Sequence, residues 1–125
     1  MDNLDLMAAQ AAQRITDATA RHKSAEVDNL ATKVLGVLQE NGVYAAVLYL
    51  LSREREKPIA RAIDHELWGL LQSLQPGVGA RPTKEEEELK AVAAVAAQPE
   101  DLLLVKRLWE QALIYARYQA KAREG

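Results

Sequence analysis

The chain has 125 residues, a length typical of a single domain with one buried core. It contains no cysteine, which excludes a disulfide framework, a thiolate nucleophile and a sulfur-ligated metal site, and which favours a cytoplasmic protein. The formal net charge is −2, with 16 Lys and Arg against 18 Asp and Glu, so the chain is not a uniformly basic nucleic-acid-binding protein.

The first two helices are indicated by apolar residues at helical spacing. One helix is expected from about Leu4 to Ala20, and a second from Ser24 or Ala25 to Glu40. Asn41-Gly42 ends the second helix, because glycine tolerates the left-handed conformation found at helix ends. The acidic residues near the N-terminus, with no long apolar segment after them, argue against a signal peptide.

The segment Val43–Leu51 is a run of nine apolar residues. A bilayer-spanning helix needs about 20 such residues, so no membrane contact is expected. A short helix that is apolar all round must be surrounded by other elements, and we therefore predict a central core helix. On this prediction Leu48 is buried, and Leu48→Asp would unfold the domain. The charged segment Arg53–Lys57 follows at the surface.

Three further helices complete the predicted fold. Pro58 suits the first turn of the fourth helix. In that helix Trp68 lies beside the apolar stripe, and it is either a partly exposed interface anchor or a residue that covers the edge of the core. Residues 75–82 contain two Pro and two Gly and are expected to form the most mobile loop. Thr83 opens the fifth helix with Glu86 in a capping-box pattern, and the last helix runs from about Pro99 to Arg123. The prediction is an all-α, single-domain bundle spanning residues 1–125, with about six helices around the apolar one.

The inventory of catalytic residues is poor. His22 and His65 are the only histidines, and they are not spaced as a pair of metal ligands. The carboxylates Glu85–Glu88 are explained by the preference of helix N-termini for negative charge. Asp64-His65-Glu66 does not form a site, because consecutive residues on a helix point in different directions, and His65 is interpreted as a solvated helix residue. We expect no enzymatic activity, no metal and no cofactor.

Clusters of Lys and Arg are the better candidates for a functional site. Arg14 and Arg21 are seven residues apart, Arg117 and Lys121 are four apart, and the Arg53 segment would continue at four-residue spacing if the helix were unbroken. The candidate phosphate contacts are Arg14, Arg21, Arg53, Arg55, Lys57, Arg61, Arg117 and Lys121. The alternative is an ordinary solvated surface, because Asp17, Glu54 and Glu56 are close enough in sequence to pair with these cations.

Two segments carry a resemblance to a known family. The first is NGVYAAVLYLLS (Asn41–Ser52). Its Asn-Gly ends the preceding amphipathic helix, and a short apolar helix follows. The second is EQALIYARYQAKA (Glu110–Ala122), a terminal helix with a Glu-x-Ala-Leu core followed by aromatic, basic and small residues. Over about Ala20 to Ala122 the chain resembles the small α-helical subunit family of the Cmr (type III-B CRISPR) RNA-targeting effector complex. It departs from the family pattern at Tyr115 and Tyr118, where larger aromatic residues are common, and in its acidic balance.

The resemblance implies a non-catalytic subunit in cytoplasmic antiviral defence. Copies would stack as an inner filament beside other Cmr effector subunits, and their basic surface would contact the phosphates of the CRISPR RNA/target RNA duplex. Two alternatives stay open. One is the small subunit of the related Csm complex, and the other is a helical protein–protein adaptor with no nucleic-acid role.

Overall fold

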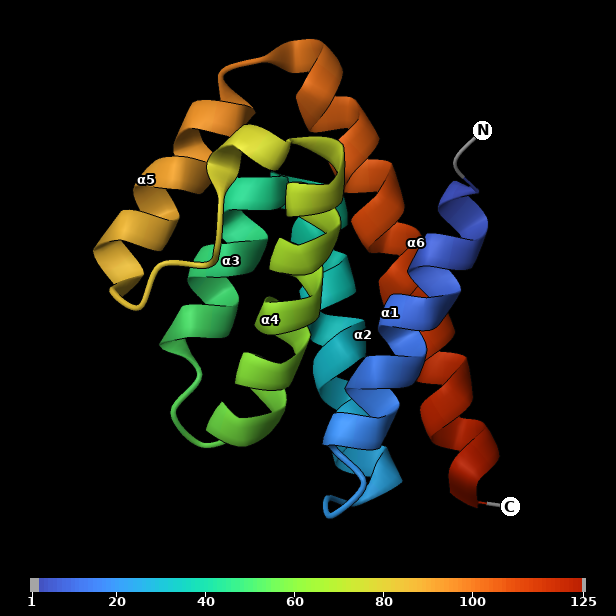
Figure 1. Ribbon diagram of the computed structural model, residues 1–125. Helices are drawn as coiled ribbons and strands as arrows, with labels where there is room; N and C mark the ends of the chain where they lie inside the picture. Colours follow the sequence, from blue (N-terminus) through green and yellow to red (C-terminus); the bar gives the residue numbers. More distant parts are fainter. Residues whose placement is uncertain (1–2, 125) are drawn as a thin grey trace.

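The computed structural model describes residues 3–124, which form six α-helices and one short 3-10 helix and contain no strand. The helices pack into one bundle, shown in Figure 1. This confirms the all-α, single-domain fold. The elements are α1 (Leu4–Ala18), α2 (Ser24–Asn41), α3 (Val43–Ser52), α4 (Lys57–Leu74), the 3-10 helix η1 (Pro76–Val78), α5 (Glu85–Ala96) and α6 (Pro99–Glu124).

The long helix α6 packs along both α1 and α2, which makes these three helices the most extensive contact in the bundle (Figure 1). Alanines line both sides of the α1–α6 contact, and Trp109 and Leu113 of α6 are completely enclosed. Small side chains let two helix backbones approach closely, so the large residues can fill the space toward α2. The fully buried alanines of the two helices are Ala8, Ala11, Ala12, Ala112, Ala116 and Ala120.

The apolar helix α3 is buried on one side only. It packs against α2, α4 and α5 through residues such as Val47 and Leu50, each 1% exposed. Tyr44 and Leu48, one helical turn apart, are 40% and 48% exposed. The prediction of burial all round, and of a buried Leu48 in particular, is therefore wrong. The reason is geometric: the neighbouring helices cover only one face of α3, and the residues at 44 and 48 share the other.

The helix ends follow backbone geometry more closely than side-chain motifs. Gly42 ends α2 as predicted, with φ at 95° and its N–H donating to the carbonyl of Leu38. Helix α1 ends at Ala18, two residues earlier than predicted. Helix α5 begins at Glu85, and within the described chain no side chain caps its start. The predicted start at Thr83, with its capping box, is therefore wrong.

The segment between α4 and α5 is attached to the bundle at two points. The indole N–H of Trp68 donates to the carbonyl of Gly79 over 3.0 Å, and Trp68 itself is 3% exposed. Arg81 donates to the carboxylate of Asp64 over 2.8 Å. Trp68 is thus a core residue that also holds the loop, which decides between its two sequence interpretations. The mobility of residues 75–82 stays a prediction.

Candidate nucleic-acid interface

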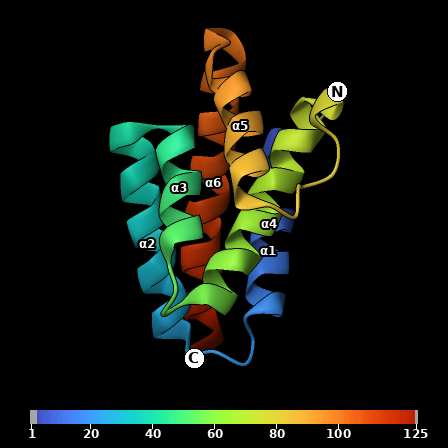
Figure 2. The same cartoon turned by 90° about the vertical axis from the view of Figure 1, so that its left-hand side faces the viewer.

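Three segments that are distant in sequence bring cations to one end of the bundle. These are the α1–α2 turn, the α3–α4 connection and the end of α6, which all lie toward the lower end in Figures 1 and 2, with the α3–α4 connection at the lower left of Figure 1 and the end of α6 at the lower right. We call this surface the basic end. Its cations are Arg21, Lys23, Arg53, Arg55, Lys57, Lys121 and Arg123.

The α1–α2 turn contributes Arg21 and Lys23, both exposed. The expected pairing of Arg14 and Arg21 on one helix face is wrong, because α1 ends at Ala18 and Arg21 lies beyond it. Arg14 remains on the helix and donates to Glu66 of α4 over 2.7 Å. Lys23 was missed by the sequence analysis, because only the folded chain places it beside cations from other segments.

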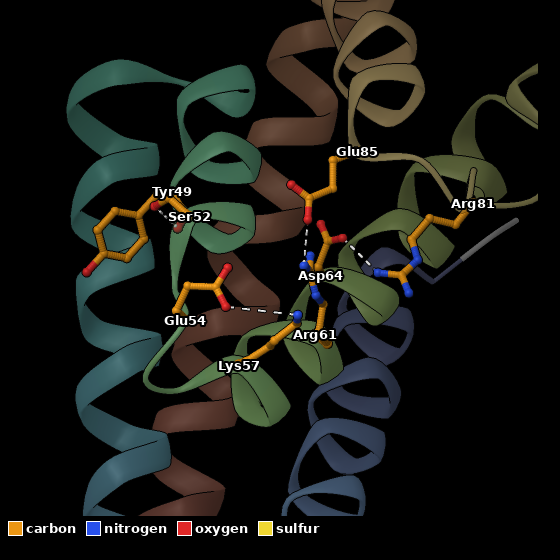
Figure 3. Close-up of polar contacts among 8 residues, drawn as sticks. All are labelled: Tyr49, Ser52, Glu54, Lys57, Arg61, Asp64, Arg81 and Glu85. Carbon is orange, nitrogen blue, oxygen red and sulfur yellow. Dashed lines mark hydrogen bonds and ion pairs between the residues drawn. The ribbon is translucent and has the colours of Figure 1, made fainter.

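The α3–α4 connection contributes Arg53, Arg55 and Lys57. Arg53 lies over the ring of Tyr49 at 4.8 Å and donates to the Tyr49 hydroxyl over 2.9 Å, which fixes its side chain. Arg55 is exposed and lines a groove of about 380 Å³ beside α2. Lys57 begins α4 and has only a distant pairing with Glu54, at 3.9 Å (Figure 3). The four-residue spacing does not form one helix face, because α3 ends at Ser52.

Helix α6 contributes Lys121 and Arg123. Lys121 is exposed and lies 4.0 Å from Asp28, which also accepts a hydrogen bond from Arg117 over 3.1 Å. Arg123 donates to the carbonyls of Thr16 and His22 and to the hydroxyl of Ser24. Arg123 therefore joins α6 to the α1–α2 turn, and its guanidinium is largely committed to the fold.

The structure divides the eight predicted contact residues into two sets. Arg21, Arg53, Arg55, Lys57 and Lys121 meet at the basic end. The other three lie a turn or more away along their helices and are engaged in ion pairs: Arg14 with Glu66, Arg61 with Glu85 and Arg117 with Asp28. Within residues 3–124, Arg21 and Arg55 make no ion pair. These two, with Lys57, are the cations most available to a phosphate.

A second polar cluster lies between α4 and α5. Asp64 and Glu88 are 1% and 3% exposed, and Figure 3 shows Arg81 reaching Asp64 and Arg61 reaching Glu85. Burial first, and then the neighbouring Asp64 carboxyl, raise the pKa of the Glu88 carboxyl from 4.5 to about 8 against the opposing charges of Arg81 and Arg61. Glu85–Glu88 do lie in the first turn of α5, but the preference of a helix start for negative charge does not account for a buried Glu88 beside a buried Asp64. Helical spacing gave no signal for this pair, because its members belong to different helices.

The described residues offer no metal site and no membrane span. Among residues 3–124, His, Asp and Glu side chains nowhere gather in a group of three or more that could hold a metal ion. In the same part of the chain, each helix is too short or too polar to cross a bilayer. His65 is exposed on α4.

Comparisons with known proteins identify no relative: no family model, no curated protein and no solved structure matches the chain.

Proposed function

We propose that this protein is a non-catalytic helical subunit of an RNA-guided, RNA-targeting effector complex of the Cmr type, and that its basic end contacts the phosphates of the target RNA. The observation that carries the proposal is the convergence of cations from three separate segments on one end of the bundle. The resemblance of Asn41–Ser52 and Glu110–Ala122 to the Cmr small subunit supports the choice of complex.

The chemistry of the basic end suits backbone contact rather than base reading. Its available groups are Arg and Lys side chains on turns, which neutralise phosphates irrespective of sequence. Carboxylates such as Glu54 and Glu56 lie among them, so one copy presents only a short cationic surface. A row of copies would present several such surfaces to one RNA, and linked weak sites gain affinity without any new contact.

Two apolar surfaces on different sides of the bundle support assembly with further subunits. One is the outer face of α3, with Tyr44 and Leu48 exposed. The other is a groove of about 310 Å³ between α1 and α6, which includes Leu4 and Leu104. A chain with two different contact surfaces can add copies head to tail, as a filament requires. The same surfaces would serve the alternative function, a protein–protein adaptor without RNA.

RNA affinity as a function of salt tests the proposal. The variant Arg55→Glu/Lys57→Glu should weaken binding of fluorescein-labelled single-stranded RNA, to a similar extent for unrelated sequences. The slope of log affinity against log salt should become shallower by about 1.4, because two phosphate contacts are lost and each contact on a single strand releases about 0.7 counterion. The matched control Lys84→Glu/Lys90→Glu makes the same charge change on exposed positions before and within α5 and should leave the slope unchanged.

An unchanged affinity and slope in the Arg55/Lys57 variant would reject the RNA contact and favour the adaptor. Complexes isolated through a tagged copy of the chain from its own cells distinguish the assemblies. CRISPR RNA in those complexes is expected for a Cmr or Csm subunit, and its absence is expected for an adaptor.

A further inference from the structure

The first half of α5 is attached to the bundle by charged side chains. Only three α5 side chains are fully buried, namely Glu88, Val92 and Val95, and both valines lie in the second half of the helix. The segment before α5 is held by Arg81 on Asp64, and Glu85 accepts a hydrogen bond from Arg61 over 2.8 Å (Figure 3). The docking of residues 79–90 therefore depends on how these charges balance.

Within residues 3–124, no neighbouring group donates a hydrogen bond to the buried Oε2 of Glu88. Its Oε2 is buried and has no hydrogen-bond partner among the described residues when the side chain is ionised. Asp64 is the neighbouring acid that raises the pKa of Glu88, and the Oδ2 of Asp64 already accepts from Arg81. Two carboxylates can only accept, so a hydrogen bond between them requires a proton on one of the two.

The charges that face Glu88 do not neutralise a second negative charge. From α4 come Asp64 and Arg61, and from the preceding segment comes Arg81. Both arginines lower the pKa of Glu88, yet each is already paired, with Glu85 and Asp64 respectively. Helix α3, which also packs against α5, carries no acidic or basic side chain, and its titratable residues are Tyr44 and Tyr49. Burial and Asp64 together outweigh the arginines, so the neutral acid is the form that fits the folded site.

We propose that Glu88 and Asp64 share one proton, and that this proton acts as a latch that keeps residues 79–90 docked on α4. Loss of the proton places two carboxylates side by side in a buried site, where their repulsion is only weakly screened. Moving the first half of α5 into water relieves this repulsion without unfolding the remaining helices, because in that half only Leu89 packs an apolar side chain against the core. Release is reversible and occurs as the solution becomes mildly alkaline.

Carboxyl-detected NMR on the full chain tests the latch. With uniform carbon-13 and nitrogen-15 labelling, the side-chain carboxyl carbon of Glu88 should titrate near pH 8, rather than between about 4 and 5 as an exposed glutamate does. The backbone amide signals of residues 79–90, and the indole signal of Trp68, should shift with the same midpoint. In Glu88→Gln, which keeps the shape but not the acid, these amide signals should no longer respond over that range.

The matched control is Glu87→Gln, the same substitution at the exposed neighbouring position, which should leave the transition intact. A Glu88 midpoint in the ordinary acidic range would overturn the proposal. So would amide signals of residues 79–90 that stay constant while Glu88 titrates. Both readouts come from the unmodified protein, so they decide the matter even if Glu88→Gln does not fold.

Discussion

Val47 and Leu48 are adjacent in the sequence and have opposite surroundings. Val47 points into the bundle and is 1% exposed, whereas Leu48 lies on the uncovered face of α3 and is 48% exposed. Both belong to the same uninterrupted apolar run, so hydrophobicity alone predicts that both side chains are buried. Leu48 and Tyr44 together expose apolar side chains on this face of α3.

We expect Leu48→Asp to fold and to melt close to the unmodified protein, within about 0.5 kcal/mol, because its carboxylate stays in water. Val47→Asp should lower the free energy of unfolding by several kcal/mol, because it buries a charge that has no partner. Thermal and urea unfolding followed by circular dichroism would measure both. Equal destabilisation by the two substitutions would contradict the one-sided burial of α3.

The Arg and Lys side chains of the basic end also differ in how far contacts within the protein hold them in place. Arg123 donates to Thr16 and His22 carbonyls, which lie at and beyond the end of α1, and thereby satisfies backbone acceptors that a helix end leaves free. Arg53 is held by Tyr49. Such residues contribute positive potential at the basic end, but their side chains cannot reach a ligand without giving up contacts within the protein.

At the scale of the helices, the α2–α3 junction depends on one glycine. Gly42 has φ 95° and ψ −173°, a conformation that is open to glycine and costly for residues with a β-carbon. An added β-carbon would meet no atom within 4 Å, so the cost of substitution is that of the backbone conformation alone.

Gly42→Ala should therefore lower the free energy of unfolding by about 1–3 kcal/mol. The control is Gly36→Ala inside α2, where space is also free and alanine is the better helix former, so stability should rise by about 0.5–1 kcal/mol. Urea denaturation of both variants measures the two changes. A Gly42→Ala protein as stable as the Gly36→Ala protein would show that the junction tolerates a different backbone conformation.

At the scale of the whole molecule, the buried carboxyl pair makes stability depend on pH. Glu88 has a pKa of about 8 in the folded protein and an ordinary value of 4.5 when exposed, so between these values the folded state holds a proton that the unfolded state has lost. Its stabilising contribution is complete below about pH 4.5 and is lost as the pH rises to about 8. The loss cannot exceed the free energy that docks the first half of α5, because undocking relieves the repulsion.

We expect the free energy of unfolding to fall with rising pH across this window, with a slope of up to about 1.4 kcal/mol per pH unit from Glu88. In Glu88→Gln that part of the slope should vanish, so that the variant becomes the more stable protein at alkaline pH. Urea unfolding at several pH values gives both curves, and their difference removes the titration of all other groups. Parallel curves for the two proteins would mean that Glu88 keeps an ordinary pKa.

The purified chain is expected to have no nuclease or other hydrolytic activity. Its two histidines lie on different elements, and within residues 3–124 the acidic side chains do not form a group that could bind a metal. Incubation of labelled RNA with the protein, with and without Mg²⁺ or Mn²⁺, checks this. Metal-dependent cleavage that disappears on substitution of Asp64 or His65 would instead assign catalysis to α4.

The all-α class, the number of helices and most of the helix ends could be predicted from local patterns in the chain. These properties are local, because apolar spacing of 3.6 residues, glycine at Gly42 and proline at Pro58 act within a few residues of chain. The sequence also identified most of the cations of the basic end, since their charge does not depend on the fold.

Which of these residues lie close to one another depends on how the helices pack. The exposure of Leu48 depends on which helices cover α3, and the proton between Asp64 and Glu88 depends on the start of α5 lying close to Asp64 of α4. The presence of Arg21, Arg55 and Lys57 at one end of the bundle depends on the α1–α2 turn and the α3–α4 connection both lying toward that end (Figure 1). The burial of a side chain, its pKa and the surface that it shares with other residues all depend on neighbours that are distant in sequence, so no local pattern predicts them.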